Sequence, residues 1–297
     1  MKTIRNFHAG EISFLKYLSN GYVASASSDN TVNVWDPNTF KTIRRYTGHQ
    51  SYVNCLDEID KDTIVSGSDD ETIHVWTLSM GEATQIIYIS GASVNTLTVL
   101  SNGYQQIVCG LNTMSENLQI YDYVTGDLVK SLSNHSMGIY SITILSDQFM
   151  ATGSADAYVI IWDLATYNVK FKLSLSSSKI YCVKRLSSNL IASAHSTGEI
   201  FVWDWLKGTH VFTLTGHTDK IYLALDLFDE QTLISGSKDK TIKFWNISRG
   251  ELIQTVNVDI PIYTLTMLKM SKSNFFNANR FQYLNQSKSV RSTVSHL

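Results

Sequence analysis

The amino-acid sequence predicts an all-β fold, a propeller built from one repeated unit. An aromatic landmark, Trp in five copies and Tyr in one, recurs in steps of 41, 45, 41, 41 and 42 residues. Between landmarks, short segments of alternating apolar and polar residues are separated by polar turns, as in consecutive antiparallel strands. A fixed period of roughly 40–45 residues is typical of four-stranded propeller blades. The landmarks are Trp35, Trp76, Tyr121, Trp162, Trp203 and Trp245.

The elements of one unit are clearest between residues 216 and 246. Apolar residues alternate with polar ones in Ile221–Leu227 and again in Thr232–Ser235. The polar turn Ser237–Lys240 follows, and Thr241–Trp245 is the third alternating segment. These segments predict three successive antiparallel strands of one blade.

Three polar positions keep a fixed distance from the landmark Trp. A His stands 27 or 28 residues before four of the Trp residues, a Ser or Thr stands ten before, and an Asp six before. Ser193 keeps the same distance from Trp203. The four complete sets are His8, Ser25, Asp29 and Trp35; His49, Ser66, Asp70 and Trp76; His135, Thr152, Asp156 and Trp162; His217, Ser235, Asp239 and Trp245.

These motifs resemble the WD-repeat β-propeller family over residues 1 to about 268. Gly48-His49, the turn Ser66–Asp70 and the Trp-Asp dipeptides at 35–36, 162–163 and 203–204 carry the resemblance. It implies that the four members of each set form a buried hydrogen-bond network within one blade. A hydrolase triad is the competing interpretation of the His, Ser and Asp. Because the set recurs in four blades and an enzyme needs one active site, we expect no enzymatic activity.

Two repeats depart from the family pattern. The third has Ser90-Gly91 in place of Gly-His, no Asp in its turn, and Tyr121 in place of Trp. The fifth has Ser176 where a His is expected and Thr197 where an Asp is expected. We expect these two blades to depend more on apolar packing and less on polar contacts.

The ends of the chain bear on how the ring closes. We expect a single propeller domain over residues 1–285, with a last blade that is degenerate or incomplete from about residue 260. Lys2–Phe7 resembles the outer strand of other blades and should complete the last blade, which closes the ring. Ile260–Leu268 reads as that blade's innermost strand and Ser273–Asn285 as a shortened hairpin. Residues 286–297 read as a loose basic tail.

Composition excludes several classes of function. The net charge is −2, which gives no general attraction to nucleic acid. We find neither a secretion signal nor a membrane span, and expect a cytoplasmic location with the nucleus as an alternative.

Cys55, Cys109 and Cys182 share no metal-ligand spacing and read as buried strand residues. No cofactor or metal is expected, because no phosphate-binding loop, zinc spacing or calcium loop is found. Trp205 is additional to the repeat and reads as a surface anchor or as a cover on the side of a blade.

One set of positions suggests a binding site. In the family, the residue five after the loop His lies at the mouth of the central channel, where peptides often dock. Seven such positions favour seven blades, and they divide into three small polar residues followed by four tyrosines. The preference of Tyr for strands does not explain why it occupies only one half. The positions are Ser13, Asn54, Asn95, Tyr140, Tyr181, Tyr222 and Tyr263.

Charged residues flank this predicted rim. Lys179 and Lys220 precede two of the tyrosines by two residues, and Lys238 lies in a nearby turn. Glu11, Asp69 and Asp70 lie near the polar half. We therefore expect an extended segment with acidic or apolar anchors toward the tyrosines. A lone cation over the rings is the alternative, which the lysines would oppose.

The resulting functional expectation is a non-enzymatic scaffold or adaptor that binds a peptide or protein segment at the channel mouth. It would act as a monomer within a larger complex, with proteins or peptides as partners and no membrane or nucleic acid. The alternative is the substrate-recognition module of a ubiquitin ligase, similar to F-box proteins that end in WD repeats. That alternative requires an N-terminal part which this sequence does not contain.

Overall fold

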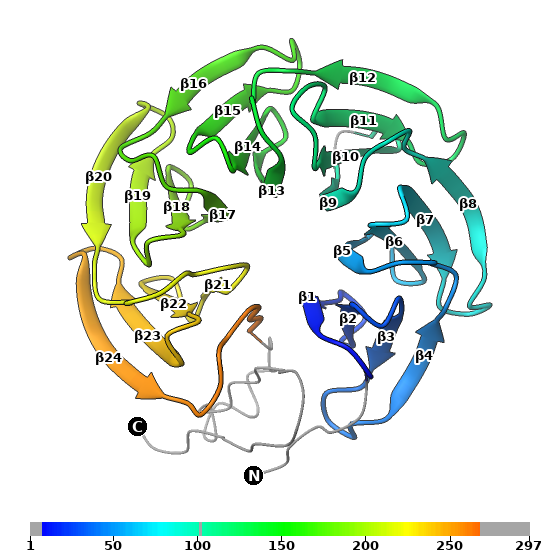
Figure 1. Ribbon diagram of the computed structural model, residues 1–297, viewed down its shortest axis with the longest axis horizontal. Coiled ribbons are helices and arrows are strands. Elements are labelled where there is room, and N and C mark those ends of the chain that lie inside the picture. The colour runs from blue at the N-terminus through cyan, green and yellow to red at the C-terminus, as the bar shows by residue number, and fades with distance from the viewer. Residues whose placement is uncertain (1–7, 101–102, 268–297) are drawn as a thin grey trace.

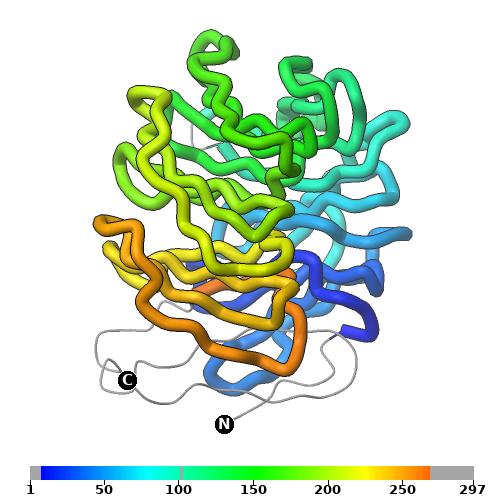
Figure 2. Tube along the Cα trace, turned by 60° about the vertical axis from the view of Figure 1, so that its left-hand side comes forward, coloured from blue at the N-terminus to red at the C-terminus, as the bar shows by residue number. Residues whose placement is uncertain are grey.

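The computed structural model of the protein describes residues 8–100 and 103–267. All regular secondary structure in these residues is β, and 24 strands form six four-stranded antiparallel sheets. The sheets follow one another round a ring in chain order (Figures 1 and 2). The expectation of an all-β propeller is confirmed. In the described part of the chain, no helix is long and apolar enough to cross a membrane.

Each sheet is one blade, and its strands run in chain order from the centre outward (Figure 1). Blades 1 to 3 comprise β1 (Ile12–Tyr17), β2 (Val23–Ser27), β3 (Val32–Trp35) and β4 (Thr42–Tyr46); β5 (Val53–Glu58), β6 (Thr63–Ser68), β7 (Thr72–Thr77) and β8 (Ala83–Tyr88); β9 (Val94–Val99), β10 (Gln106–Leu111), β11 (Leu118–Asp122) and β12 (Leu128–Leu132). Blades 4 to 6 comprise β13 (Ile139–Ser146), β14 (Phe149–Ser154), β15 (Val159–Asp163) and β16 (Val169–Leu173); β17 (Ile180–Arg185), β18 (Leu190–His195), β19 (Ile200–Asp204) and β20 (Thr209–Leu214); β21 (Leu225–Leu227), β22 (Thr232–Gly236), β23 (Thr241–Asn246) and β24 (Glu251–Asn257).

Burial follows the position of a strand within its blade. Every residue of β2 and β3 is buried, whereas the outer strand β4 is mostly exposed. The middle strands are covered on both faces by the neighbouring blades, so they consist of apolar and small residues with little alternation. The core is therefore divided into layers between blades.

Small residues on the second strand let adjacent blades approach closely. A Cβ atom added at Gly67, Gly110, Gly153 or Gly236 would lie within 3 Å of an apolar side chain from the segment that follows the blade. Those partners are Val94, Ile139, Ile180 and Ile262. Because the same contact recurs round the ring, a glycine here is a packing requirement between blades.

The strands predicted between residues 216 and 246 are found, with one difference. The segments at 232–235 and 241–245 correspond to β22 and β23. The segment predicted from Ile221 to Leu227 forms a strand only at Leu225–Leu227. The residues before Leu225 do not form a regular strand. Leu223 instead forms an isolated parallel bridge with Thr264.

The chain after β24 returns to the centre of the ring beside β21. The backbone N–H of Ile262 donates to the Ser237 carbonyl at 3.0 Å, and that of Met267 donates to the Asp226 carboxylate at 2.8 Å. The described part of the predicted strand Ile260–Leu268 thus lies next to the innermost strand of blade 6. The other predictions about the ends, at Lys2–Phe7, Ser273–Asn285 and 286–297, lie outside the described residues.

Candidate functional site

A β-bulge marks the predicted rim position in each of the first five blades. In each of these blades, the pairing between the first and second strands skips one residue. The skipped residues of blades 1 to 5 are, in order, Ser13, Asn54, Asn95, Tyr140 and Tyr181. A bulged residue leaves the regular pleat, so its side chain is aimed away from the sheet. The sequence therefore builds the same local irregularity five times to direct one side chain per blade.

All seven predicted rim residues line one cavity of about 330 Å³. The remaining lining residues are Glu11, Ile12, Ser28, Tyr52 and Leu223. The cavity has the size of the smaller pockets that bind ligands, which span roughly 300–1,000 Å³. It offers room for one side chain or a short piece of extended chain.

Four tyrosines, here called the tyrosine arc, form one side of the cavity: Tyr140, Tyr181, Tyr222 and Tyr263. Successive ring centroids lie 5.3, 4.8 and 5.3 Å apart, with interplanar angles of 51°, 41° and 29°. These are the spacings of favourable aromatic pairs, so each ring holds its neighbour in place. Burial, together with Tyr222 and Tyr140, raises the pKa of Tyr181 above its usual value.

Ser13, Asn54 and Asn95, here called the polar arc, form the opposite side. All but one of their donor groups are engaged with the protein, the exception being one N–H of the Asn95 amide. The Asn54 amide N–H groups donate to the Asp69 carboxylate at 2.7 Å and the Val94 carbonyl at 3.1 Å. The Asn95 amide donates to the Ile139 carbonyl at 3.2 Å. The Ser13 hydroxyl donates to the Val53 carbonyl.

The lysines expected beside the tyrosines do not line the cavity. Lys179 is exposed, and Lys220 is half-buried but is absent from the lining. Among the described lining residues, the one charged side chain is Glu11, which occupies the corresponding position in blade 1. Neither lysine therefore contributes to the lining, and the basic character predicted for the aromatic side of the rim stays a prediction. Glu11 was expected near the polar half of the rim, and it precedes Ser13 by the two residues that separate Lys179 from Tyr181.

The structure brings together the polar sets away from the cavity. In all four, the His Nδ1–H donates to the Asp carboxylate at 2.8 to 3.0 Å. The His Nε2 meets the Ser or Thr hydroxyl at 2.7 to 2.9 Å. The indole N–H of Trp76, Trp162 and Trp245 donates to that hydroxyl at 2.8 to 3.3 Å. In the remaining set, that of blade 1, Trp35 is likewise buried. The recurring geometry ties a loop, a turn and two strands within each blade.

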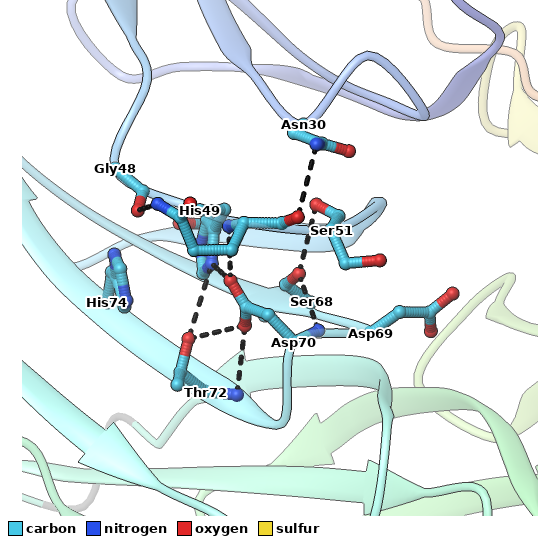
Figure 3. A network of polar contacts seen from close by, with 12 residues as sticks. Asn30, Gly48, His49, Ser51, Ser68, Asp69, Asp70, Thr72 and His74 are labelled. Atoms are coloured by element: carbon cyan, nitrogen blue, oxygen red, sulfur yellow. Dashed lines mark hydrogen bonds and ion pairs between the residues drawn. The ribbon is translucent and has the colours of Figure 1, made fainter.

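Electrostatics in the sets of blades 1 and 6 favour an ionised Asp and a neutral His. Burial alone would raise the pKa of Asp29, but hydrogen bonds from Thr31 and the Ala9 backbone and the nearby His8 lower it to about 2. Burial lowers the pKa of His8 and of His217, against the opposing effect of the carboxylates. Figure 3 shows His49 and Asp70 of the blade 2 set, where Asp70 faces His49 and Thr72.

Blade 5 contains a polar network that the sequence analysis missed. His195, on β18, contacts the Ser178 hydroxyl at 2.8 Å and the Ser193 hydroxyl at 2.9 Å. The Trp203 indole donates to the same Ser193 at 2.9 Å. The expectation that blade 5 has few polar contacts is therefore wrong, because an imidazole from the strand replaces the one expected from the loop. A buried His ending the apolar strand Leu190–His195 was the available signal.

Blade 3 follows the expectation of apolar packing. Tyr121 is buried among apolar residues of blades 2 and 3, including Cys109, and its hydroxyl donates to Gln119 at 2.7 Å.

All three cysteines are free thiols buried in strands. Trp205 is buried against Phe149 of blade 4, so the interpretation as a cover on the side of a blade is correct.

One cluster of described residues has the composition of a metal site but not its geometry. Ligand atoms of His49, Asp70 and His74 lie within 4.8 Å of one another. The two imidazoles stack with centroids 4.0 Å apart and planes 18° apart, so their in-plane lone pairs run parallel and do not converge. Nδ1 of His74 is also bonded to the Tyr46 hydroxyl at 2.6 Å. The cluster is a hydrogen-bonded ring stack (Figure 3).

The fold and the repeated sets define a repeat propeller, and comparison with known sequences identifies its family. The profile of the family described as "WD domain, G-beta repeat" matches residues 1–36, 40–77, 126–163 and 208–246, just over half of the chain. The chain therefore belongs to the WD-repeat family. The unmatched stretches include most of blade 3 and most of blade 5, whose polar sets depart from the pattern.

Relatives share this repeat region. The chain is 30% identical over 153 residues to mouse WD repeat-containing protein 41, covering 49% of this chain and 32% of that protein. It is 28% identical to mouse F-box/WD repeat-containing protein 4, covering 50% and 37%. It is also 28% identical to the Arabidopsis DENN domain and WD repeat-containing protein SCD1, covering 46% and 11%. The matches thus span about a third or less of most of these relatives.

A solved structure has a similar fold. The crystal structure of the computationally designed Ika8 protein is 27% identical, with a TM-score of 0.72. The similarity covers 88% of this chain and 79% of that one.

Proposed function

We propose that this protein is a non-enzymatic adaptor that binds an extended segment of another protein at the channel mouth. The observation that carries the proposal is the tyrosine arc, four adjacent rings at equivalent positions around one cavity. Aromatic side chains in concave sites are frequent anchors for protein partners. Membership of the WD-repeat family, whose propellers generally bind other proteins, supports the same class of function.

The cavity is built for recognition without rearrangement. The rings support one another through direct ring contacts, and the polar arc is fixed by bonds to the next blade. A preorganised site loses little side-chain entropy on binding, so more of the contact energy contributes to affinity. The adaptor would act as a monomeric propeller within a larger assembly.

The second candidate is substrate recognition within a ubiquitin ligase. It is favoured by the similarity to mouse F-box/WD repeat-containing protein 4, whose name includes both an F-box and WD repeats. The same channel mouth would then hold the substrate segment, and an F-box would have to be supplied elsewhere. Capture experiments separate the two candidates, because the second predicts that ligase subunits are recovered together with the substrate.

We further propose that the ring has seven blades and is closed by the N-terminal strand. Support comes from Ile262, which contacts Gly236 as Ile180 contacts Gly153 two blades earlier. The bond from Met267 to Asp226 also matches the bond from Val99 to Asp57 between blades 2 and 3. Residues up to Met267 therefore repeat the contacts of an innermost strand.

Affinity capture tests the binding proposal. The variant Tyr181→Ala with Tyr222→Ala should lose the partners recovered by the wild type, with a fall in affinity of roughly 2 kcal/mol or more if these rings are hot spots. The matched control is Tyr88→Ala with Tyr104→Ala, because these tyrosines are 77% and 71% exposed and lie outside the cavity. Unchanged capture by the rim variant would refute the proposal.

A further inference from the structure

The polar arc presents hydrogen-bond acceptors to the cavity. Both amide protons of Asn54 are used by Asp69 and Val94, and one amide proton of Asn95 is used by Ile139. Carbonyl and carboxylate oxygens accept only, so they fix the amide nitrogens toward the protein. The amide oxygens of Asn54 and Asn95 then stay available as acceptors for a ligand that donates.

The charge of the cavity favours the same kind of ligand. Glu11 lines it, and no cationic side chain belongs to its lining among the described residues. The effect of Glu11 reaches the tyrosine arc: after burial, its charge is the largest cause that raises the pKa of Tyr263. Lys238 partly opposes this effect at Tyr263, and Asp219 adds to it. Lys238 itself is exposed and outside the lining.

Aromatic walls add a third feature. The faces of tyrosine rings carry negative partial charge and attract cations within about 6 Å of the ring centroid. Four such rings stand on one side, with the acceptors of the polar arc and Glu11 on the other. Carboxylate, amide oxygens and ring faces around a small cavity together suit a positive group that donates several hydrogen bonds.

We infer that the cavity takes up the cationic side chain, lysine or arginine, of the bound segment. The inference rests on the proposed function and specifies the chemistry of its anchor. It replaces the acidic or apolar anchor expected when Lys179 and Lys220 were placed at the rim. The cation would lie between the tyrosine arc and the polar arc, with its N–H groups toward Glu11 and the amide oxygens.

A series of short peptides tests the inference directly. The probes are Ac-Gly-Gly-X-Gly-Gly-NH₂ with X as Arg, Lys, Gln, Leu or Glu, titrated into the full chain and followed by ligand-detected NMR. We expect the Arg and Lys peptides to bind and the Leu and Glu peptides to bind about tenfold more weakly or not at all. The Arg and Lys arms show which of the two cations the cavity prefers.

A charge variant locates the binding. Glu11→Gln should weaken the Arg and Lys peptides about tenfold, the value of one charge-assisted hydrogen bond, and leave the Leu peptide unchanged. Glu230→Gln is the matched control, because Glu230 is exposed and outside the cavity. Equal effects of the two substitutions would overturn the inference.

The outcomes separate this inference from the proposed function. Preferential binding of the Glu or Leu peptide, lost on Tyr181→Ala with Tyr222→Ala, would overturn the cation and keep the channel-mouth site. Binding of the Arg peptide that survives the tyrosine substitutions would overturn the cation anchor in the cavity, and partner capture by the same variant would decide the adaptor role separately. Absence of binding by every peptide would overturn the cation anchor, while capture by the tyrosine variant would still decide the adaptor role.

Discussion

Substitution of His217 by Ala removes the centre of the polar set in blade 6. The imidazole Nδ1–H donates to Asp239 at 2.8 Å, and Nε2 meets the Ser235 hydroxyl at 2.7 Å. After the substitution, Asp239 keeps bonds from Thr218 and Thr241, so the carboxylate stays largely satisfied. Ser235 keeps the indole N–H of Trp245. The loss is therefore two hydrogen bonds and a small cavity.

The magnitude follows from these contacts. A buried polar group that loses its partner costs about 1–3 kcal/mol, and we expect about 2 kcal/mol here because both partners keep other bonds. For a domain of this size, that corresponds to a fall in melting temperature of roughly 4–8 °C. Trp245→Ala should cost more, roughly 3–5 kcal/mol, because the indole is fully buried.

Thermal and urea unfolding of the purified variants measure these losses. His210→Ala is the control, because this His is exposed on β20 and its hydrogen bond to Thr213 is at the surface. We expect the control to cost less than about 1 kcal/mol. Equal stability of His217→Ala and wild type would refute the assignment of the repeated set to fold stability.

Three further predictions concern stability and closure. Burial lowers the pKa of His195 to about 4, so between about pH 6.5 and 4 the unfolded chain binds a proton that the folded chain does not. The free energy of unfolding should therefore fall by up to about 3 kcal/mol on acidification through this range. Urea unfolding at several pH values should show a shallower dependence of stability on pH for His195→Asn than for the wild type. Gly153→Val should cost roughly 1–3 kcal/mol in thermal melts, because the new side chain overlaps Ile180; a wild-type melting temperature would contradict the account of blade packing. Deletion of residues 1–7 should give aggregated protein by size-exclusion chromatography, whereas deletion of residues 286–297 should be tolerated; a soluble monomer after the first deletion would count against closure by the N-terminal strand.

The repeat made most of the described fold predictable from the sequence. Strand order, blade boundaries and the four His-Asp pairs follow from spacing, because each unit has to bury its sheet against the next one. The rim positions were found because one residue per blade occupies an equivalent place. The bulges that aim these residues were not predicted, since a skipped residue leaves no signal in an alternating pattern.

Other features depend on contacts between segments and could not be read from spacing. His195 replaces the missing loop His of blade 5 from a strand position where blades 2 and 4 have Ser68 and Ser154. Which charged side chains line the cavity could not be predicted, because residue spacing fixes the position of a Cα atom but not that of the end of a long side chain. Lys179 extends into solvent from the same position at which Glu11 lines the cavity.

Site-specific photo-crosslinking tests the central claim most directly. A photoreactive phenylalanine analogue would replace Tyr222, in the tyrosine arc, and Tyr88, on the outer strand β8. With captured partner, or with the Arg peptide described above, we predict crosslinks from position 222 to a basic segment and none from position 88. Crosslinking at position 88 alone, or at position 222 to a segment without lysine or arginine, would contradict the account.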